Sequence, residues 1–547
     1  MGGDLFLSGG ASFEEVRLLG ANIGSDVSAI GSTFDGTFRA DGMETGGSLF
    51  LSGGASFNEV RLLGAKIGGN VEADGSTFDG TLSAEGMETG GDLFLRGGAS
   101  FKEVRLLAAK IGGNLEAINS TFDGTLSAHG METGGDLFLS GGASFKKVRL
   151  LGAKIGGIVS AIGSTFDGTF IANGMETGGS LFLRIDASFK EVDLLGAKIG
   201  GDVSAVGSTF DGTFSADGME TGGSLFLSGD ASFKEVRLLG AKIGGNVEAI
   251  GSTFDNKFRA DGMETSGSLF LRGGASFKDV DLPNARIGGD VQMQGSVFDG
   301  EVDLSGASIR TDFMLSRGDE DVTVWPDGAV LKLRNLRAGA LQASEAAWKA
   351  ADGGMVATDL TGFAYDRLGG VTADQRKTLA EADIGFFRAW FASQPDHADV
   401  YDPQPYEQLA RALEAAGAER VAEQVRFEKW QHKRAVGGLP FAERTGLFLR
   451  RWLVAHGTLP FLPLAYFGAL VLAGIGAAFG SRDPRLAGLG PKVWYSLENA
   501  LPLVELKEAH KQVEHGRDWV EGFFHFQKVA GFALATILVG ALTLLGG

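Results

Sequence analysis

The chain contains no cysteine, which excludes disulfide bonds, thiolate catalysis, cysteine-ligated zinc, iron–sulfur clusters and attached c-type haem. Proline and tyrosine are scarce, with 11 and 5 residues among 547, whereas glycine and phenylalanine are abundant, with 87 and 40. The glycines follow no strict three-residue period, so the composition does not indicate collagen. We therefore expect a periodic structure that uses glycine and phenylalanine.

Positive charge is also in deficit, because 49 Lys and Arg stand against 68 Asp and Glu, a formal net charge of −19. Binding to a nucleic-acid backbone needs a basic face, so we expect no nucleic-acid partner. The N-terminus, MGGDLFLSGG, lacks the basic and apolar regions of a secretory signal. We find no phosphate loop and no nucleophile paired with a base, so no catalytic or cofactor-binding residue and no cofactor are predicted.

A repeat of 44 residues dominates the first part of the chain. The phrase METGGSLFLSGGASF, first found at residues 43–57, returns nearly unchanged five times at this interval. Each unit divides into two related coils of about 22 residues, because GAKIGGNVEADG aligns with GMETGGSLFLSG. Apolar and polar residues alternate in short runs between glycine-rich corners, which indicates strands. Such coils bury their inner side chains only by stacking at about 4.8 Å, so the pattern predicts a β-solenoid over residues 1–317, about 70 Å long.

Positions 44 residues apart form columns that we expect to point inward as ladders. Two columns are phenylalanine and one is isoleucine: Phe13, Phe57, Phe101, Phe145, Phe189, Phe233 and Phe277; Phe34, Phe78, Phe122, Phe166, Phe210, Phe254 and Phe298; Ile23, Ile67, Ile111, Ile155, Ile199, Ile243 and Ile287. Corner glycines are expected to supply positive φ angles. A further column, which begins with Asp35 and Asp79, precedes glycine in most repeats and indicates Asp-Gly turns.

The small-x-apolar pairs, which recur about every five residues, resemble a loosened version of the pentapeptide-repeat superfamily. This resemblance implies a right-handed, four-sided β-helix, although 22 residues per coil exceed four fives. The segments DPQPYEQLARALEAAGAERVAEQVRFEKWQHKR (402–434) and VWYSLENALPLVEL (493–506) are similar to those of a group of bacterial proteins with such a solenoid followed by a membrane hairpin. Some of them are labelled membrane-associated oxidoreductases, so the resemblance also implies an enzyme as an alternative.

The repeat dissolves after residue 317. Residues 318–370 predict degenerate coils or a cap, and 371–452 a small helical segment. Residues 453–547 predict a transmembrane hairpin, because 459–480 and 529–547 carry no charge and are long enough to span a bilayer. Trp452, Trp494, Tyr495 and Trp519 flank these spans, as interface anchors do.

The basic residues close to the first span balance on its two sides. Lys429, Lys433 and Arg434, farther upstream, favour a cytoplasmic side for the solenoid. We therefore expect the chain in the inner membrane of a bacterium, with the solenoid in the cytoplasm and residues 481–528 outside.

The strongest candidate for a functional site is a column of outward phenylalanines. We expect the outward residue to be polar on three faces of the solenoid, as in Arg61, Glu72 and Ser83, but aromatic on the fourth. The resulting stripe repeats on alternate coils at about 9.6 Å and predicts a binding or self-association face, unless neighbouring side chains shield it. It consists of Phe6, Phe50, Phe94, Phe138, Phe182, Phe226 and Phe270.

No metal site is predicted. His510, His515 and His525 lie with Glu508 and Glu514 between the spans, but their spacing closes no ligand set. The aspartate column lacks the pattern of a calcium-binding repeat.

These observations favour a membrane-anchored scaffold or protein-interaction module with no evident catalysis. The alternatives are a membrane-associated enzyme and an acidic rod that mimics DNA. The expected partners are the membrane, a protein, and a second copy of the chain, bound through the solenoid face or the N-terminal edge. Met1 leads directly into a full coil with no cap, so we expect a start that is truncated and an edge open to end-to-end association.

Overall fold

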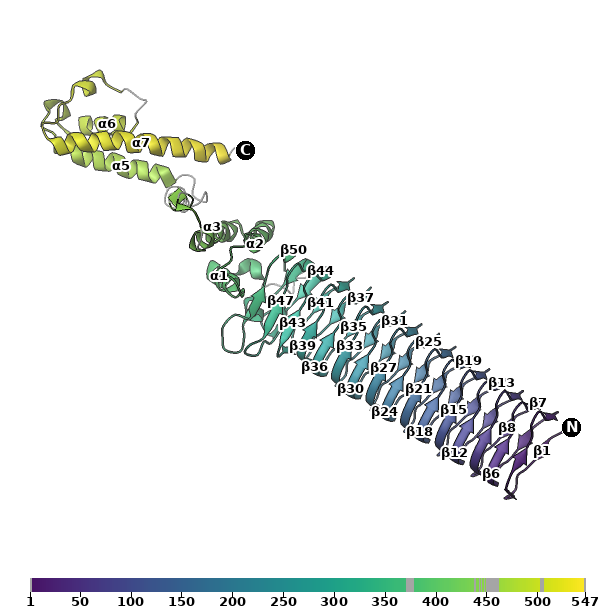
Figure 1. Ribbon diagram of the computed structural model, residues 1–547. Helices are drawn as coiled ribbons and strands as arrows, with labels where there is room; N and C mark the ends of the chain where they lie inside the picture. Colours follow the sequence, from purple (N-terminus) through teal and green to yellow (C-terminus); the bar gives the residue numbers. More distant parts are fainter. Residues whose placement is uncertain are drawn as a thin grey trace. The chain divides into compact units, whose positions relative to one another are not determined.

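A computed structural model describes residues 2–369, 378–436, 439–441, 443, 445–446, 448, 462–501 and 506–545 (Figure 1). The chain forms two compact units. One comprises Met1–Pro395 with Ala415–Gly417, and the other comprises Asp396–Glu414 with Ala418–Gly547.

The first unit contains a β-solenoid of about 14 coils of about 22 residues each, as predicted. All strands along the solenoid pair in parallel with the same position of the coils before and after them. Each coil carries four short ladders, which we call the first to fourth faces. One double coil contains β7 (Glu44–Thr45, first face), β8 (Leu49–Phe50, second), β9 (Ser56–Arg61, third and fourth), β10 (Lys66–Ile67, first), β11 (Val71–Glu72, second) and β12 (Thr77–Ser83, third and fourth).

These six strands recur with 44-residue spacing up to β41 (Val291–Gln292). The coils before them contain β1 (Leu5–Phe6), β2 (Ser12–Phe13), β3 (Val16–Arg17), β4 (Asn22–Ile23), β5 (Val27–Ser28) and β6 (Thr33–Arg39). The ladders continue into the irregular region through β42 (Val297–Phe298), β43 (Glu301–Asp303), β44 (Ser308–Met314), β47 (Val330–Lys332), β48 (Arg337–Gln342), β49 (Ala357–Asp359) and β50 (Ala364–Leu368). A small antiparallel hairpin, β45 (Ser316–Arg317) and β46 (Asp321–Val322), projects between them.

The two predicted phenylalanine columns are inward and form a single stack. Neighbouring rings lie 4.6–5.1 Å apart, nearly parallel, in the order Phe13, Phe34, Phe57, Phe78, Phe101, Phe122, Phe145, Phe166, Phe189, Phe210, Phe233, Phe254, Phe277 and Phe298. The two phenylalanine columns fall into one stack because alternate coils carry one extra residue between the third and fourth faces. The register shifts at this residue, so that Phe78 pairs with Phe57 on one side and with Phe101 on the other. The isoleucine column is also buried, with exposed fractions of 2–4%.

The predicted Asp-Gly turns are wrong. Asp35 and Gly36 lie inside the continuous strand β6, at the position of the register shift. A Cβ on Gly36 would lie 1.9 Å from the carbonyl oxygen of Glu14 in the preceding coil, so glycine is required there by close approach between coils. Corner glycines such as Gly42, with φ of 65°, do use the left-handed region as expected.

The solenoid ends on aromatic side chains. The 3-10 helix η1 (Glu345–Trp348) places Trp348 against Trp390 of α1 (Ile384–Ala392), with ring centroids 4.9 Å apart, and both side chains are buried. A short 3-10 turn, η2 (Leu379–Glu381), precedes α1, which begins after Asp383, whose carboxylate accepts from the amide of Phe386.

The second unit is helical. It contains α2 (Gln404–Ala415), α3 (Glu419–Ala435), α5 (Leu462–Ala478), η4 (Pro484–Leu486), α6 (Leu489–Ala500), η5 (Glu508–Gln512) and α7 (Asp518–Leu545). Helices α5, α6 and α7 pack against one another, and the first predicted span coincides with α5, apart from residues 459–461, which lie outside the described residues. The helix that contains the second predicted span, α7, begins eleven residues before that span, at Asp518.

Among the described residues, one helix is long and apolar enough to cross a membrane, over Asp518–Val539 of α7, and α5 is a shorter apolar helix of 17 residues. Of the predicted interface anchors, Trp494 and Trp519 are exposed, whereas Trp452 lies outside the described residues. The prediction for Tyr495 is wrong, because its ring is buried against Phe524, with centroids 4.8 Å apart.

Candidate functional site: the second face of the solenoid

The predicted phenylalanine stripe lies on the outer side of the second face. Its members share this face with polar residues of the intervening coils, because Phe50 pairs with Ser28 on one side and Glu72 on the other. The expectation that Phe50 and Glu72 occupy different faces is therefore wrong. Phe6 is 69% exposed at the open end, the next five are half-buried or buried, and Phe270 is half-buried. The stripe is thus a partly shielded row.

Arginine side chains shield every second phenylalanine of the stripe. The guanidinium carbons of Arg96, Arg184 and Arg272 lie 3.8, 4.3 and 5.0 Å from the ring centroids of Phe94, Phe182 and Phe270, each two residues earlier. The equivalent positions after Phe50, Phe138 and Phe226 are Ser52, Ser140 and Ser228. Phenylalanines without a covering arginine therefore recur every 88 residues, about 19 Å along the solenoid.

A second apolar row runs beside the stripe, and the sequence analysis missed it. On five of the seven intervening coils the outward position after the strand is β-branched, at Ile30, Ile118, Ile162, Val206 and Ile250, whereas the other two carry Asp74 and Gln294. Four of these side chains lie over a glycine of the next coil: a Cβ on Gly53, Gly141, Gly229 or Gly273 would come within 2.7–3.1 Å of them. The β-branched residues recur in the sequence at multiples of 44 residues, but only the structure shows that they lie on the same face as the phenylalanines.

The two rows meet without carboxylates in the middle of the second face. We define the central patch as Phe138, Ile162, Phe182, Val206 and Phe226. The strand positions between its phenylalanines are Ser160 and Ser204, whereas Glu116 and Glu248 pair with Phe138 and Phe226 at the two ends of the patch. Ile158 adds another apolar side chain where neighbouring coils carry Asp136 and Ser180. The central patch is therefore the most apolar part of this face.

Arg184 follows Phe182 of the central patch and forms no ion pair with a described carboxylate, as is also true of Arg272. Arg96, its equivalent two double coils earlier, forms ion pairs with Asp74 at 3.1 Å and Glu116 at 2.6 Å. No described carboxylate lies within 4 Å of the Arg184 guanidinium, and its Nε is buried without a hydrogen-bond acceptor. Its neighbours at the same position of the adjacent coils are Ile162 and Val206.

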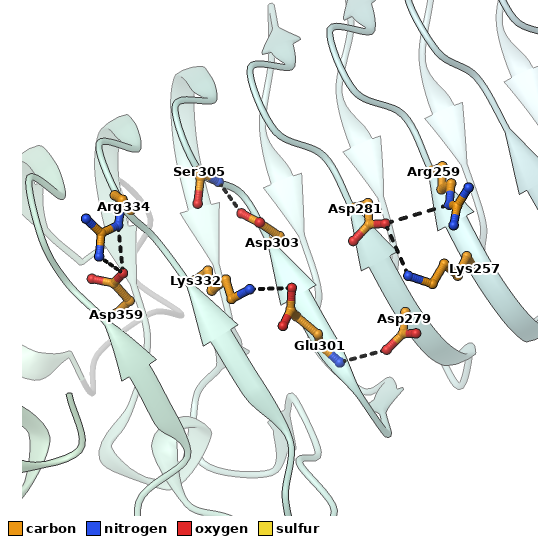
Figure 2. A network of polar contacts seen from close by, with 10 residues as sticks. All are labelled: Lys257, Arg259, Asp279, Asp281, Glu301, Asp303, Ser305, Lys332, Arg334 and Asp359. Atoms are coloured by element: carbon orange, nitrogen blue, oxygen red, sulfur yellow. Dashed lines mark hydrogen bonds and ion pairs between the residues drawn. The ribbon is translucent and has the colours of Figure 1, made fainter. Parts of the chain in front are cut away.

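The other polar faces of the solenoid are internally paired. The first face carries an alternating ladder of acidic and basic side chains, with Lys66, Lys154 and Lys242 at 3.4, 3.8 and 3.0 Å from glutamates of the preceding coil. Figure 2 shows the fourth face near the irregular end, where Lys332 pairs with Glu301 at 2.5 Å and Arg334 with Asp359 at 2.8 Å.

Asp281 lies in the same network, with Arg259 at 3.8 Å and Lys257 at 3.9 Å (Figure 2). Burial raises the pKa of its carboxyl, against the opposing effect of these two cations. These charged side chains near the irregular end of the fourth face therefore pair with one another.

The histidines between α5 and α7 do not converge. His510 contacts Glu498 at 2.5 Å, whereas His515 is held by the hydroxyls of Tyr495 and Ser481, each at 3.0 Å, and His525 is exposed. Burial lowers the pKa of His515 below its ordinary value of 6.5. Within the described part of the chain, no group of three or more His, Asp or Glu side chains could hold a metal ion.

Comparisons with known proteins found no relative. A scan against protein-family models, a search of curated proteins and a search of solved structures each gave no match.

Proposed function

We propose that the protein is a membrane-attached scaffold whose solenoid binds a protein partner through the second face. The observation that carries this proposal is the central patch. Three phenylalanines and two β-branched residues lie there on five consecutive coils, and the nearest acidic strand positions of this face are Glu116 and Glu248 at its two ends. Contiguous apolar surfaces of this kind are uncommon on soluble monomers and mark interaction sites. A rigid stack of parallel ladders keeps such a strip in a constant geometry.

Attachment to a membrane is supported by the outer surfaces of α5 and α7. Only 17% of the apolar stretch of α7 is buried, and its exposed side chains include Phe526, Val529 and Phe532 at 61, 71 and 54%. On α5, Leu472 is 70% exposed. A core helix of a soluble protein would bury these side chains, and lipid is the solvent that favours their exposure. We propose the arrangement that the sequence predicts, a helical hairpin in a bacterial inner membrane with the solenoid on the cytoplasmic side.

The proposal is tested by site-specific photo-crosslinking in cells that produce the full chain. A benzophenone amino acid replaces Ile162 in the central patch or, as the control, Lys154 on the first face. We expect discrete protein adducts from position 162 only, and their loss when Phe138 and Phe226 are both changed to Ser. Equal adducts from both positions, or none from position 162, would reject the second face as a docking surface.

Attachment is tested separately by alkaline carbonate extraction of membranes. The native chain should stay in the pellet, whereas the double variant Val529→Lys, Phe532→Lys should be released. Release of the native chain would reject insertion. The enzyme and DNA-mimic alternatives have no further observation in their favour beyond the resemblance and the acidic composition.

A further inference from the structure

The unpaired guanidinium of Arg184 indicates which chemistry the partner must bring to the central patch. Its Nε is buried without an acceptor, and its plane lies over the ring of Phe182 at 4.3 Å. The adjacent coils present Ile162 and Val206 at the same position and Ser160 and Ser204 beside the ring. Asp186, at the following corner, does not come within ion-pair distance.

Such a position is costly in the free protein and favourable in a complex. A guanidinium that is partly desolvated and lacks a carboxylate loses hydration without gaining a partner. The fork of N–H groups matches a carboxylate bidentately, and the surrounding apolar side chains would exclude water from the pair. Arg96, at the equivalent position, already pairs with two carboxylates of its own chain and needs no carboxylate from a partner.

The spacing of the patch indicates the conformation of the partner. Phe138 and Phe226 each lie two coils from Phe182, about 9.6 Å along the solenoid on either side. A polyproline II segment rises about 3.1 Å per residue with three residues per turn, so side chains three residues apart recur on one side at about 9.3 Å. A strand would point residues three apart to opposite sides.

We infer that the central patch binds an extended, polyproline-II-like segment of a protein partner with the pattern apolar-x-x-acidic-x-x-apolar. Its Asp or Glu pairs with Arg184, and its two apolar side chains pack on Phe138 and Phe226. This inference rests on the proposed function and names the partner's chemistry at the same site.

The test is selection of a displayed library of random dodecapeptides on the purified full chain in detergent. We expect the enriched peptides to carry an acidic residue with apolar residues three positions to either side. Their affinity should fall at least tenfold for Arg184→Gln, whereas the matched variant Arg96→Gln should bind as the native chain does. Changing the acidic residue of a peptide to its amide should cause a similar loss, and no additional loss on Arg184→Gln.

Two results would overturn the inference, and they are distinguishable. Peptides that depend on Phe138 and Phe226 but lack an acidic residue, or bind Arg184→Gln unchanged, refute the acidic segment and leave the docking face standing. Peptides indifferent to Phe138→Ser, Phe226→Ser, or no enrichment at all, refute both.

An independent observation concerns α6, which lies at the depth of the apolar helices. The Ser496 hydroxyl donates to the carbonyl oxygen of Val471 in the middle of α5, at 2.8 Å. The amide of Gln527 on α7 donates to the Ser496 hydroxyl at 2.8 Å and to the carbonyl oxygen of Leu470 at 3.2 Å. At the end of α6 the backbone of Ala500 approaches Gly531 so closely that a Cβ there would lie 2.1 Å from the Ala500 oxygen.

These contacts place the end of α6 near the middle of α7 (Figure 1). Gly531 follows Asp518 by thirteen residues, about 20 Å along a helix that rises 1.5 Å per residue. The hydrocarbon core of a bilayer is about 30 Å thick. The geometry points to α6 as a re-entrant half-span helix that enters the membrane from the side of η4 and η5. Residues 489–500 would then lie within the membrane, not outside it.

The test places single spin labels on the full chain in vesicles of phosphatidylethanolamine and phosphatidylglycerol. Collision with oxygen or with a water-soluble nickel chelate reports the depth of each label. Leu497→Cys on α6 and Val529→Cys on α7 should favour oxygen, and Arg517→Cys, directly before α7, should favour nickel. Trp494→Cys provides a second, exposed position on α6.

Nickel access at both α6 positions, together with oxygen preference at position 529, would refute the half-span helix. Nickel access at position 529 as well would refute membrane attachment itself.

Discussion

Replacing Phe145 with Ala should open the solenoid locally, because this ring is a fully buried member of the phenylalanine stack. Its centroid lies 4.7 Å from that of Phe122 and 4.9 Å from that of Phe166, and its exposed fraction is 0%. Removing a buried phenylalanine costs about 3–5 kcal/mol through lost transfer energy and the cavity. Stacking on two neighbours places this ring in the upper part of that range. We expect a loss of about 4–5 kcal/mol.

Hydrogen exchange is the suitable assay, because a long repeat array does not unfold in one two-state step. The amide of Ser144 donates to Ser120 O and that of Thr165 to Ala143 O, both at 3.0 Å, so these amides report the coils on either side of the substitution. A loss of about 4 kcal/mol corresponds to about a thousandfold faster exchange.

Coils near the N-terminus should exchange as before, and Lys146→Ala, the exposed neighbour on the same strand, should change little. An acceleration of less than about fivefold, equivalent to about 1 kcal/mol, would show that the ring is not a core residue.

Three further predictions concern the ladders, the glycines and pH. Lys154→Ala on the first face should change the free energy of unfolding by about 0.5 kcal/mol or less, because the ion pair of Lys154 with Glu132 at 3.8 Å is exposed. A larger loss, measured by thermal unfolding, would mean that the ladder acts as a network. Gly124→Ala should perturb hydrogen exchange in its coil far more than Gly130→Ala. At Gly124 a Cβ would lie 2.0 Å from a carbonyl oxygen of the preceding coil, whereas at Gly130 it would enter open space and only the φ of 61° is unfavourable. Equal effects would contradict the close approach at Gly124. Burial lowers the pKa of folded His515 below 6.5, so as the pH falls below 6.5 protons bind more readily to the opened state. Stability of the α5–α7 loops should fall from there down to the lower folded pKa. The variant His515→Gln should remove this dependence, and a pH profile unchanged by that variant would contradict it.

The solenoid and its inward columns could be predicted from the sequence because both follow from local alternation repeated at a constant interval. A period of two assigns each side chain to the inside or the outside, and glycine at each corner ends the strand. Phe57, Phe78 and Ile67 are buried as that rule requires. The same rule placed Phe50 outward, but it could not say which residues of neighbouring coils surround it.

The helical end illustrates the limit of a hydropathy pattern. The pattern identified α5 and the apolar part of α7, since each is continuous in sequence. It left α6 in a loop, because the contacts that position this helix join Ser496 to residues 25 and 31 positions away. Mean apolarity carries no information about such partners.

The sequence by itself thus determined the coil length and the direction of the side chains in the inward columns, because these depend on neighbours within a few residues. Only the tertiary structure decided what meets across coils. The extra residue in alternate coils brings two phenylalanine columns into one stack, and the 22-residue offset sets Ile162 and Val206 beside Arg184 instead of a carboxylate. Register between segments far apart in the chain is set by packing of the whole solenoid, and it is this register that creates the central patch and its unpaired charge.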